Sequence, residues 1–385
     1  MFQANADSFS SRTPHYYSMK ACLNHLRILS ELPYPSWSLI PSIMSIVRKH
    51  IAGSVSVFVW INKKTLQPIS IWVDPVNNEA YCNCINYFNE IIGCVLPAKE
   101  MISSKGRAIK YIENDPSYEK SIMYEKVFKP YGIHWGMSIP VNMSGDSLGF
   151  MGISRPKEAG QYSMQGWANW DLIGNSLQKL DQPQNSWVLL PDPDYREVEC
   201  STLWFNSEGG IIAQGNQAKN LLFLAQQNGM EAPNWVRADW RALPPSIYLE
   251  AKKILSSSWQ NVSEKTLNFK WGKFTFLLEK MPLILNGNEQ VTLNVTIRYF
   301  EPYDISIARA LWGWPLSPQE KRILIASTRH PSLSQLSRTL GLTLGTLKNY
   351  INRLDARFSV DSREVLNELV WEQYSRNKDL CHIPP

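Results

Sequence analysis

The chain has 385 residues, of which 44% are hydrophobic and 19% charged, and its formal net charge is +5. This composition excludes a disordered protein, and the length predicts two to four domains. No run of about 18 apolar residues occurs and the first residues have no apolar signal-peptide core, so we expect a cytoplasmic protein without a membrane span.

The cysteine pattern predicts neither disulfides nor a metal site. Cys82 and Cys84 are two positions apart, but the second pair or the histidine partners that a zinc site needs do not follow. We therefore expect reduced thiols, no metal and no cofactor, with a redox or metal sensor as the alternative.

Residues 1–183 predict a first α+β domain in which helices cover an antiparallel sheet. Apolar spacing and turn signals give the order helix, helix, strand pair, helices, strand pair, closing helix. The expected helices are 19–29, 39–51, 82–93, 117–132 and 163–180, and the expected strands are 54–61, 68–73, 135–141 and 148–154.

Aromatic residues are frequent near this predicted sheet. Trp60, Trp72, Tyr87 and Trp135 suggest a pocket for a small apolar or planar ligand, and the alternative is that they are core or interface residues.

A proline-containing linker is expected at 184–200, and residues 201–302 predict a second, smaller α+β domain. Its expected elements are strands 202–206 and 211–214, a helix over 217–227, a hairpin turning at Gly272 and Lys273, and an alternating strand over 291–300. A short amphipathic helix at 303–315 is interpreted as a linker or a dimer contact.

Residues 316–376 predict four short helices, followed by a tail at 377–385. Ser317 and Glu320 form a capping box, and Ser332 begins the second helix. Gly341 can end that helix and Thr343 can cap the third, while residues 361–364 are expected to cap the fourth. The tight turn between the second and third helices predicts a helix-turn-helix.

The third of these helices has two different faces. Leu347, Ile351, Leu354 and Phe358 form an apolar stripe, and the opposite face carries amides and bases. Residues 316–363 hold eight bases and three acids, so the whole net charge of +5 lies in this segment. Such a basic module on a neutral body is typical of a polyanion-binding end.

Those side chains suit the major groove of DNA, where base edges present donors and acceptors. We expect Lys348, Asn349 and Asn352 to contact bases, and Thr346, Arg353 and Arg357 to contact phosphates. The alternative is an ordinary solvated face on a core helix.

The same segment resembles the LuxR-type helix-turn-helix of bacterial transcription regulators. The matching positions are Leu316, Pro318, Glu320, Leu324, Leu336, Leu340, Leu342, Thr346, Leu347, Lys348, Ile351, Leu354, Phe358, Val360 and Arg363. The resemblance implies a four-helix domain that binds DNA as a dimer on a two-fold site. It also implies that Lys348, Asn349 and Asn352 contact bases, and that Thr346, Arg353 and Arg357 contact phosphates. Gln335, Ser337 and Tyr350 depart from the usual Glu, Ala and His, and the usual turn glycine is missing from "TRHPS".

The upstream domains resemble known sensor modules. "YGIHWGMSIPV" and "SLGFMGISRP" are similar to a GAF-like domain, and "WFNSEGGIIAQGNQAKNLL" is similar to a PAS-like module. The pocket pattern of acyl-homoserine-lactone receptors is not found, so the resemblance assigns no ligand.

Together these patterns predict a dimeric, signal-responsive transcription regulator that is not an enzyme. No Gly-rich phosphate loop, HExxH or GxSxG occurs. Its expected partners are double-stranded DNA, a second copy of the chain and a small molecule, with RNA polymerase as a further candidate. The rival readings are a regulator controlled by abundance alone, an antagonist that binds another regulator, and an enzyme using the GAF-like cavity.

Overall fold

The structure, a computed structural model, describes most of the chain. The described residues are 18–65, 68–74, 109–110, 118–142, 147–177, 180, 195–226, 237–269, 271–285, 288–330 and 332–376. The helix predicted over 82–93, Tyr87 and the tail at 377–385 lie outside them.

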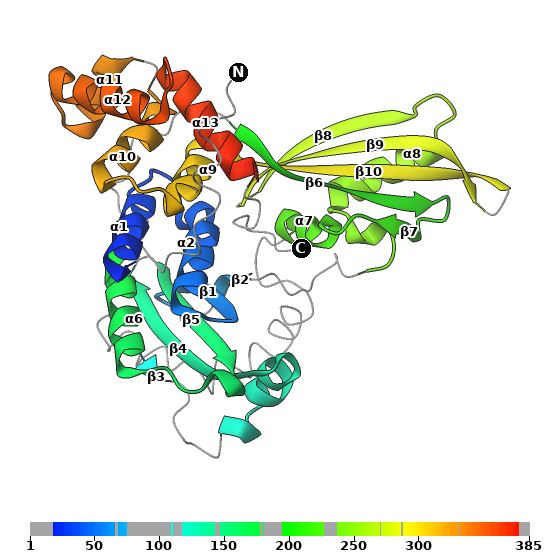
Figure 1. Cartoon of the computed structure of the whole chain (residues 1–385). Coiled ribbons are helices and arrows are strands. Elements are labelled where there is room, and N and C mark those ends of the chain that lie inside the picture. The colour runs from blue at the N-terminus through cyan, green and yellow to red at the C-terminus, as the bar shows by residue number, and fades with distance from the viewer. Residues whose placement is uncertain are drawn as a thin grey trace.

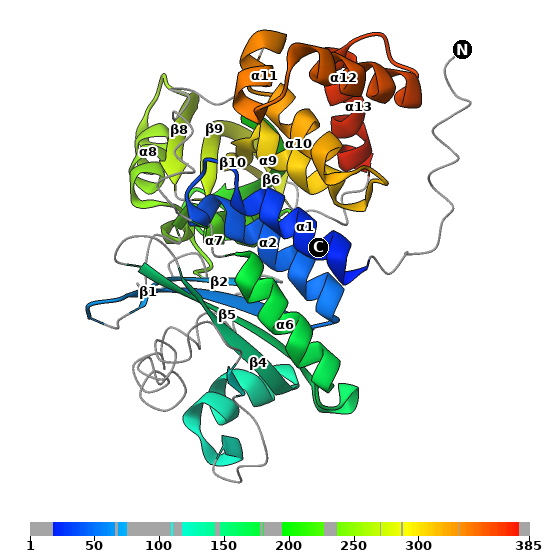
Figure 2. The same cartoon turned by 90° about the vertical axis from the view of Figure 1, so that its left-hand side faces the viewer.

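The first sheet is antiparallel, with strand order β2-β1-β5-β4-β3; helices α2 and α6 pack against it, and α1 packs against these two helices (Figures 1 and 2). Both predicted hairpins are confirmed. The strands are β1 (Val55–Asn62), β2 (Pro68–Asp74), β3 (Ile109–Lys110), β4 (Ile133–Asn142) and β5 (Ser147–Pro156), and the helices are α1 (Met19–Ser30), α2 (Ser36–Ile51) and α6 (Met164–Ser176).

Alternation along β4 explains how α6 is seated. Met137, Ile139 and Val141 are fully buried on one face of the strand. Gly174 of α6 approaches this face so closely that a Cβ there would lie 2.4 Å from the Ile139 side chain. The glycine therefore allows the closing helix to lie directly on the sheet.

The segment before β4 differs from the prediction of an α-helix over 117–132. It consists of the 3₁₀ turns η2 (Tyr118–Lys120) and η4 (Lys129–Tyr131) around the π-helical turn η3 (Met123–Phe128). Pro130 has no N–H to donate, and Gly132 has a φ of 65° and ends the helical path. Periodicity does not distinguish these turn types, since their side chains follow similar spacing.

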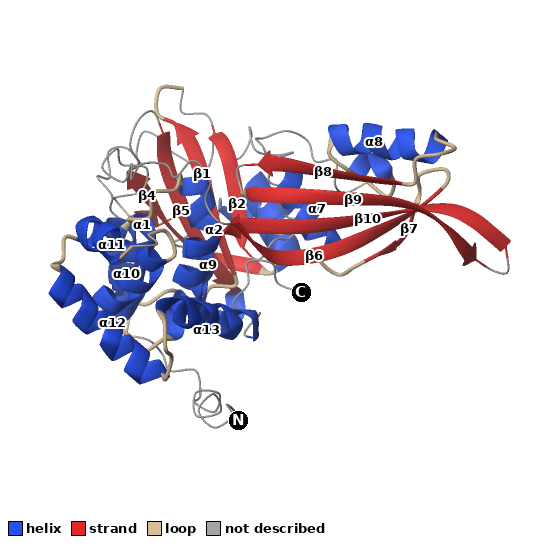
Figure 3. Cartoon of the chain, turned by 90° about the horizontal axis from the view of Figure 1, so that it is seen from above, coloured by secondary structure: helices blue, strands red, loops and turns tan. Residues whose placement is uncertain are grey.

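The second sheet is also antiparallel, with strand order β7-β6-β10-β9-β8, and α7 and α8 pack against it (Figure 3). Its elements are β6 (Tyr195–Asn206), β7 (Ile211–Gln214), α7 (Ala218–Gln226), η7 (Trp240–Ala242), α8 (Pro245–Ser256), β8 (Val262–Phe269), β9 (Gly272–Leu285) and β10 (Asn288–Pro302). Strand β6 begins at Tyr195, inside the segment expected to be a linker. Its early residues pair with the end of β10, which the sequence of β6 alone does not reveal.

The β8–β9 hairpin turns earlier than predicted. Phe269 pairs with Gly272, so Gly272 already belongs to strand β9 and the hairpin turns before it. Gly272 is needed for another reason, because a Cβ at this position would lie 2.5 Å from the carbonyl oxygen of Phe300 on β10. The glycine therefore marks a close approach of two strands.

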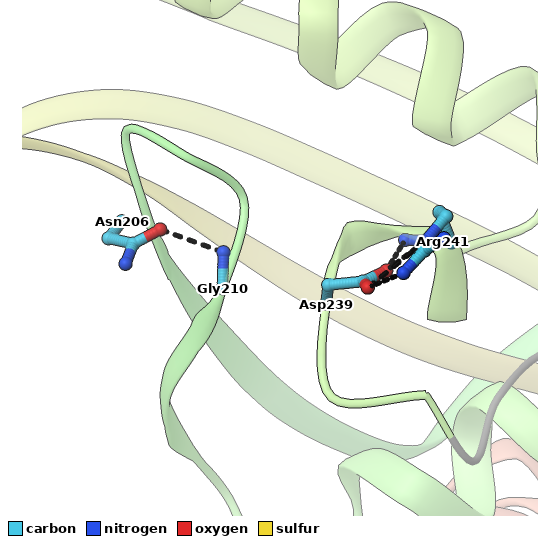
Figure 4. A network of polar contacts seen from close by, with 4 residues as sticks. All are labelled: Asn206, Gly210, Asp239 and Arg241. Atoms are coloured by element: carbon cyan, nitrogen blue, oxygen red, sulfur yellow. Dashed lines mark hydrogen bonds and ion pairs between the residues drawn. The ribbon is translucent and has the colours of Figure 1, made fainter.

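A polar network holds the β6–β7 turn against η7 (Figure 4). The Asn206 side-chain oxygen accepts a hydrogen bond from the Gly210 N–H at 2.7 Å, and Asp239 forms an ion pair with Arg241. Gly210 also forms a β-bridge with Asp239. These contacts brace the second sheet and are distant from the C-terminal helices (Figure 1).

Four α-helices end the described chain, and a buried helix connects them to the second sheet. Helix α9 (Tyr303–Ala310) follows β10 directly, and all its residues are buried. The turn η8 (Leu311–Gly313) leads to α10 (Pro318–Ser327), α11 (Leu333–Leu340), α12 (Leu344–Phe358) and α13 (Arg363–Arg376). Because α9 contacts α1, α2, α10 and α13, it lies where the three parts of the fold meet (Figure 1).

Candidate nucleic-acid interface

Side-chain caps set the ends of α10, α11 and α12. The predicted capping box is present: the Ser317 Oγ accepts from the Glu320 N–H at 3.3 Å, and Glu320 accepts from the Ser317 N–H at 2.7 Å. Ser332 caps α11 in the same way by accepting from the Gln335 N–H. These bonds satisfy N–H groups that have no partner inside the helix.

The turn between α11 and α12 is as short as the sequence predicts. Gly341 has a φ of 63° and ends α11, and the Thr343 Oγ1 accepts from the Thr346 N–H at 3.2 Å. The Ser337 carbonyl oxygen also accepts a hydrogen bond from the Leu342 N–H, at 3.0 Å from nitrogen to oxygen. The chain thus reverses within three residues, which fixes the angle between the two helices.

The cap of α13 lies within the predicted segment 361–364. Ser362 accepts from the Val365 N–H at 3.3 Å, and the helix begins at Arg363. The Ser362 hydroxyl thus satisfies an N–H group in the first turn of α13.

The apolar stripe of α12 holds the helix onto its neighbours. Leu347 and Leu354 are 0% and 1% exposed, and Ile351 and Phe358 pack partly buried against the same core. The Phe358 ring also contacts Trp314, with 5.0 Å between the ring centroids. Burial of the stripe determines which side of α12 faces outward.

The opposite face is open. Lys348, Asn349 and Asn352 are all exposed. Within the described part of the chain, no hydrogen bond or ion pair engages these three side chains. Their donors and acceptors are therefore available to another molecule.

The three flanking residues have different surroundings. Thr346 is exposed, and its hydroxyl lies 2.9 Å from that of Thr343. The Arg353 guanidinium lies over the Tyr350 ring, 4.5 Å from its centroid, whereas Arg357 donates to the Pro315 carbonyl oxygen at 2.8 Å. Arg353 is thus oriented by a ring at the surface, and Arg357 joins α12 to the segment before α10.

Helix α12 lies at the edge of the molecule, away from both sheets (Figures 1 and 3). Helix α13 and α10 pack on the inner side of α12 and α11. No other described element covers Asn349 or Asn352, since both remain exposed in the whole chain.

Of the predicted aromatic residues, Trp60 and Trp72 lie close together around a third tryptophan. Trp60 and Trp72 are buried and both contact Trp271 of the second sheet's hairpin, at 5.6 and 5.0 Å between ring centroids. Trp135 instead donates from Nε1 to the Lys157 carbonyl oxygen at 3.2 Å. Tyr87 lies outside the described residues, so the predicted aromatic pocket stays a prediction.

Sequence patterns did not reveal the charges buried around α9. Arg309 pairs with Glu301, and Arg329, just after α10, pairs with Asp304, all four side chains being at most 7% exposed. The Tyr34 ring lies 4.8 Å from the Arg329 guanidinium carbon. Opposite charges at distant positions give no periodic signal, which is why these pairs could not be foreseen.

A cavity of about 430 Å³ lies where α1 meets α10 and α11. The Arg322 guanidinium pairs with Glu31 beside it, at 2.8 Å from nitrogen to oxygen. The lining residues are Ile28, Glu31, Leu32, Gln319, Arg322, Ile325, Ala326, Arg329, Thr339 and Leu340.

Two basic groups near this junction have shifted pKa values. Burial, with a smaller effect of the Lys321 ammonium, holds the pKa of His25 well below its ordinary value. Burial lowers the pKa of Lys321 to about 8, and its Nζ donates to the Trp312 carbonyl oxygen at 3.2 Å. Both groups are enclosed between α1, η8 and α10.

Among the residues that the structure describes, no helix combines the length and apolar character needed to cross a membrane. The same residues contain no group of three or more His, Cys, Asp or Glu side chains arranged to hold a metal ion.

Comparisons with known proteins give only distant similarities. No protein-family model matches the chain, and no curated protein matches it. Among solved structures, the E. coli DhaR(N)–DhaL complex is 12% identical at a TM-score of 0.23, covering 68% of this chain and 86% of that one.

Two further similar structures are of VqmA. One, bound to DPO, is 10% identical at a TM-score of 0.19, over 44% of this chain and 83% of that chain. The other is the Vibrio cholerae VqmA dimer without target DNA, described as a LuxR-type receptor, which is 10% identical at a TM-score of 0.19 over 49% and 86% of the two chains. Similarities this weak support no inference about activity.

Proposed function

We propose that the chain is a sequence-specific DNA-binding transcription regulator whose last four helices form a LuxR-type helix-turn-helix. The observation that carries this proposal is the exposed face of α12. Lys348, Asn349 and Asn352 lie uncovered on a capped helix whose other side is buried. An α-helix fits the major groove, where lysine donates to guanine and asparagine bonds adenine in two places.

The flanking residues would position the helix on the DNA backbone. Thr346 lies in the first turn of α12, where N–H groups and the helix dipole favour a phosphate. Arg353 is exposed and stacked on Tyr350, which limits its rotamers before binding. Arg357 already donates to Pro315, so a phosphate would share its guanidinium with that carbonyl.

We further propose that the chain acts as a homodimer. A two-fold DNA site requires two copies of α12, and recognition by a single helix reads few bases. We propose GAF-like and PAS-like folds for the two upstream sheets, which would dimerise or sense a signal. A signal would change DNA affinity only if it stabilised the DNA-competent and incompetent dimer arrangements to different extents. Catalysis and contact with RNA polymerase form no part of the proposal.

The second candidate is a protein antagonist that uses the same face to bind another regulator. The exposed amides of Asn349 and Asn352 would serve a protein partner as well as a base. The salt dependence of binding separates a DNA partner from a protein partner, since only a phosphate backbone releases many condensed counterions when it is bound.

A DNA selection tests the proposal without knowledge of the operator. The full chain would be used to enrich duplexes from a random library, and affinity for the enriched duplex would be measured by fluorescence anisotropy. We expect Lys348→Ala and Asn352→Ala each to weaken binding by about 1–3 kcal/mol and to relax one base preference.

Alanine is the best helix former, so neither substitution should destabilise this exposed helix. Lys219→Ala, on the exposed surface of α7, removes the same charge far from α12 and should leave affinity unchanged. Failure to enrich any duplex, or unchanged affinity in both α12 variants, would contradict the proposal.

A further inference from the structure

The cavity between α1 and the C-terminal helices has apolar walls from two separate parts of the fold. Ile28 lies at the end of α1 and Leu32 just after it, whereas Ile325 and Leu340 come from α10 and α11. Its volume of about 430 Å³ is in the range of small-molecule sites, roughly 300–1,000 Å³. Any occupant would touch both sides of the junction.

The cavity also contains an unused hydrogen-bond donor. Arg322 donates from Nη2 to Glu31 at 2.8 Å, but 40% of its side chain stays exposed, and no second acceptor among the described residues engages its guanidinium. A guanidinium with exposed N–H groups is well suited to bind a carboxylate. Arg329, the other cation in the lining, is paired with Asp304 and lies against Tyr34.

The balance of charge in the lining favours an anion over a cation. Two guanidinium groups and one carboxylate, Glu31, belong to the lining, and the counter-charge of Asp304 lies behind Arg329. A ligand cation would meet Arg322 and Arg329 without a free carboxylate to receive it. A monocarboxylate could accept from the exposed part of the Arg322 guanidinium while Glu31 keeps the bond from Nη2.

We infer that this cavity binds a small organic monocarboxylate with an apolar body. The carboxylate accepts from Arg322, and the apolar body packs between Leu32 and Leu340. Because the walls belong to α1 on one side and to α10 and α11 on the other, the ligand stabilises the docked arrangement of the C-terminal helices. An effect on DNA affinity rests on the proposed function, whereas the binding site itself does not.

Methyl NMR of the full chain tests the site directly and without DNA. The probes are hexanoate, octanoate and 1-naphthaleneacetate, added to protein carrying ¹³C-labelled isoleucine methyl groups. We expect at least one probe to shift the Ile28 and Ile325 signals saturably, while Ile212 and Ile284, exposed on the second sheet, stay unchanged.

Octanol and Arg322→Met identify the carboxylate contact. Octanol has the same apolar tail without the charge, and we expect it to bind the wild-type chain roughly 10–100-fold more weakly than octanoate. In Arg322→Met this preference should disappear, since the donor is gone but the apolar stem remains. Ala326→Leu, which fills part of the cavity, should weaken both probes equally.

Two results would overturn the inference. One is that no probe shifts the Ile28 and Ile325 methyl signals of the wild-type chain, which requires no variant to fold. The other is an octanoate preference that persists in Arg322→Met. Loss of DNA binding with intact probe binding would contradict the proposed function alone.

Discussion

His25 shows how one residue can link stability to pH. The side chain is fully buried in α1, with its ring centroid 5.2 Å from that of Trp312. Burial and the Lys321 ammonium lower its pKa, so the folded chain holds the neutral form. Below the ordinary histidine pKa of about 6.5 the unfolded chain binds a proton that the folded chain does not, and the folded state loses stability.

We therefore expect the free energy of unfolding to fall as the pH decreases from about 7 to 5.5. His25→Leu should flatten this decline, because the variant has no group that gains a proton only on unfolding. Denaturant unfolding at several pH values measures it. His50→Gln is the matched control: burial also lowers the pKa of His50, but this side chain is less enclosed, so its removal should change the slope less.

For single residues of α12, the sequence predicted which side chains are buried, but it did not predict all the residues that they contact. Spacing identified Leu347 and Leu354 as buried and Asn349 and Asn352 as exposed, because helix geometry fixes which residues share a face. The hydrogen bond from Arg357 to Pro315 could not be predicted from the sequence, since it joins residues 42 positions apart. The DNA contacts themselves stay predictions.

Among the elements, the α11–α12 turn was the most predictable because its signals are local. Gly341 adopts a left-handed conformation, and nothing lies within 4 Å of the position that a Cβ would take. Any cost of a side chain there is therefore backbone strain and not a clash. Leu342 N–H closes the turn by donating to the Ser337 carbonyl.

Gly341→Ala should lower the local stability of α11 and α12 by about 1 kcal/mol, because alanine is strained at positive φ. Hydrogen exchange of the amides in these helices measures the change without unfolding the other domains. Gly345→Ala is the control, since Gly345 also has open space around it but lies inside α12 with ordinary φ. Equal loss in both variants would contradict this role for the turn.

Helix α9 was the least predictable element. Its amphipathic pattern indicated a linker or a dimer contact, yet Asp304 and Arg309 are buried along with its apolar residues. Their charges are tolerated because Arg329 and Glu301 pair with them. Sequence reasoning missed this because the partners lie outside α9, on β10 and in the segment after α10.

Arg329→Met should destabilise the chain by about 3–5 kcal/mol, because it leaves Asp304 buried without its partner. Adding Asp304→Leu should recover most of that loss, since no lone charge remains. Arg322→Met is the comparison: the Arg322–Glu31 pair is partly exposed, so its loss should cost about 0–1 kcal/mol. Thermal unfolding of the wild type, Arg329→Met, the double variant and Arg322→Met checks the order of their stabilities. A double variant that is no more stable than Arg329→Met would contradict this account.

At the scale of the whole molecule, the two sheets and the C-terminal helices converge on α9. Trp271 of the second sheet's hairpin contacts Trp60 and Trp72 of the first sheet, and Glu31 of α1 pairs with Arg322 of α10. A change in either upstream part can therefore alter how α10 to α13 are held. The sequence predicted both sheets and the helical end, but not this convergence, because it depends on contacts between residues far apart in the chain.

The central claim is that the exposed face of α12 enters duplex DNA, and a salt titration tests it most directly. Affinity of the full chain for its enriched duplex would be measured across salt concentrations, for the wild type, Arg353→Ala and Lys219→Ala. We predict that log K falls linearly with log salt, and that Arg353→Ala reduces the slope by about 1 while Lys219→Ala leaves it unchanged. Affinity that stays flat as salt rises, or a slope that Arg353→Ala does not change, would contradict the claim.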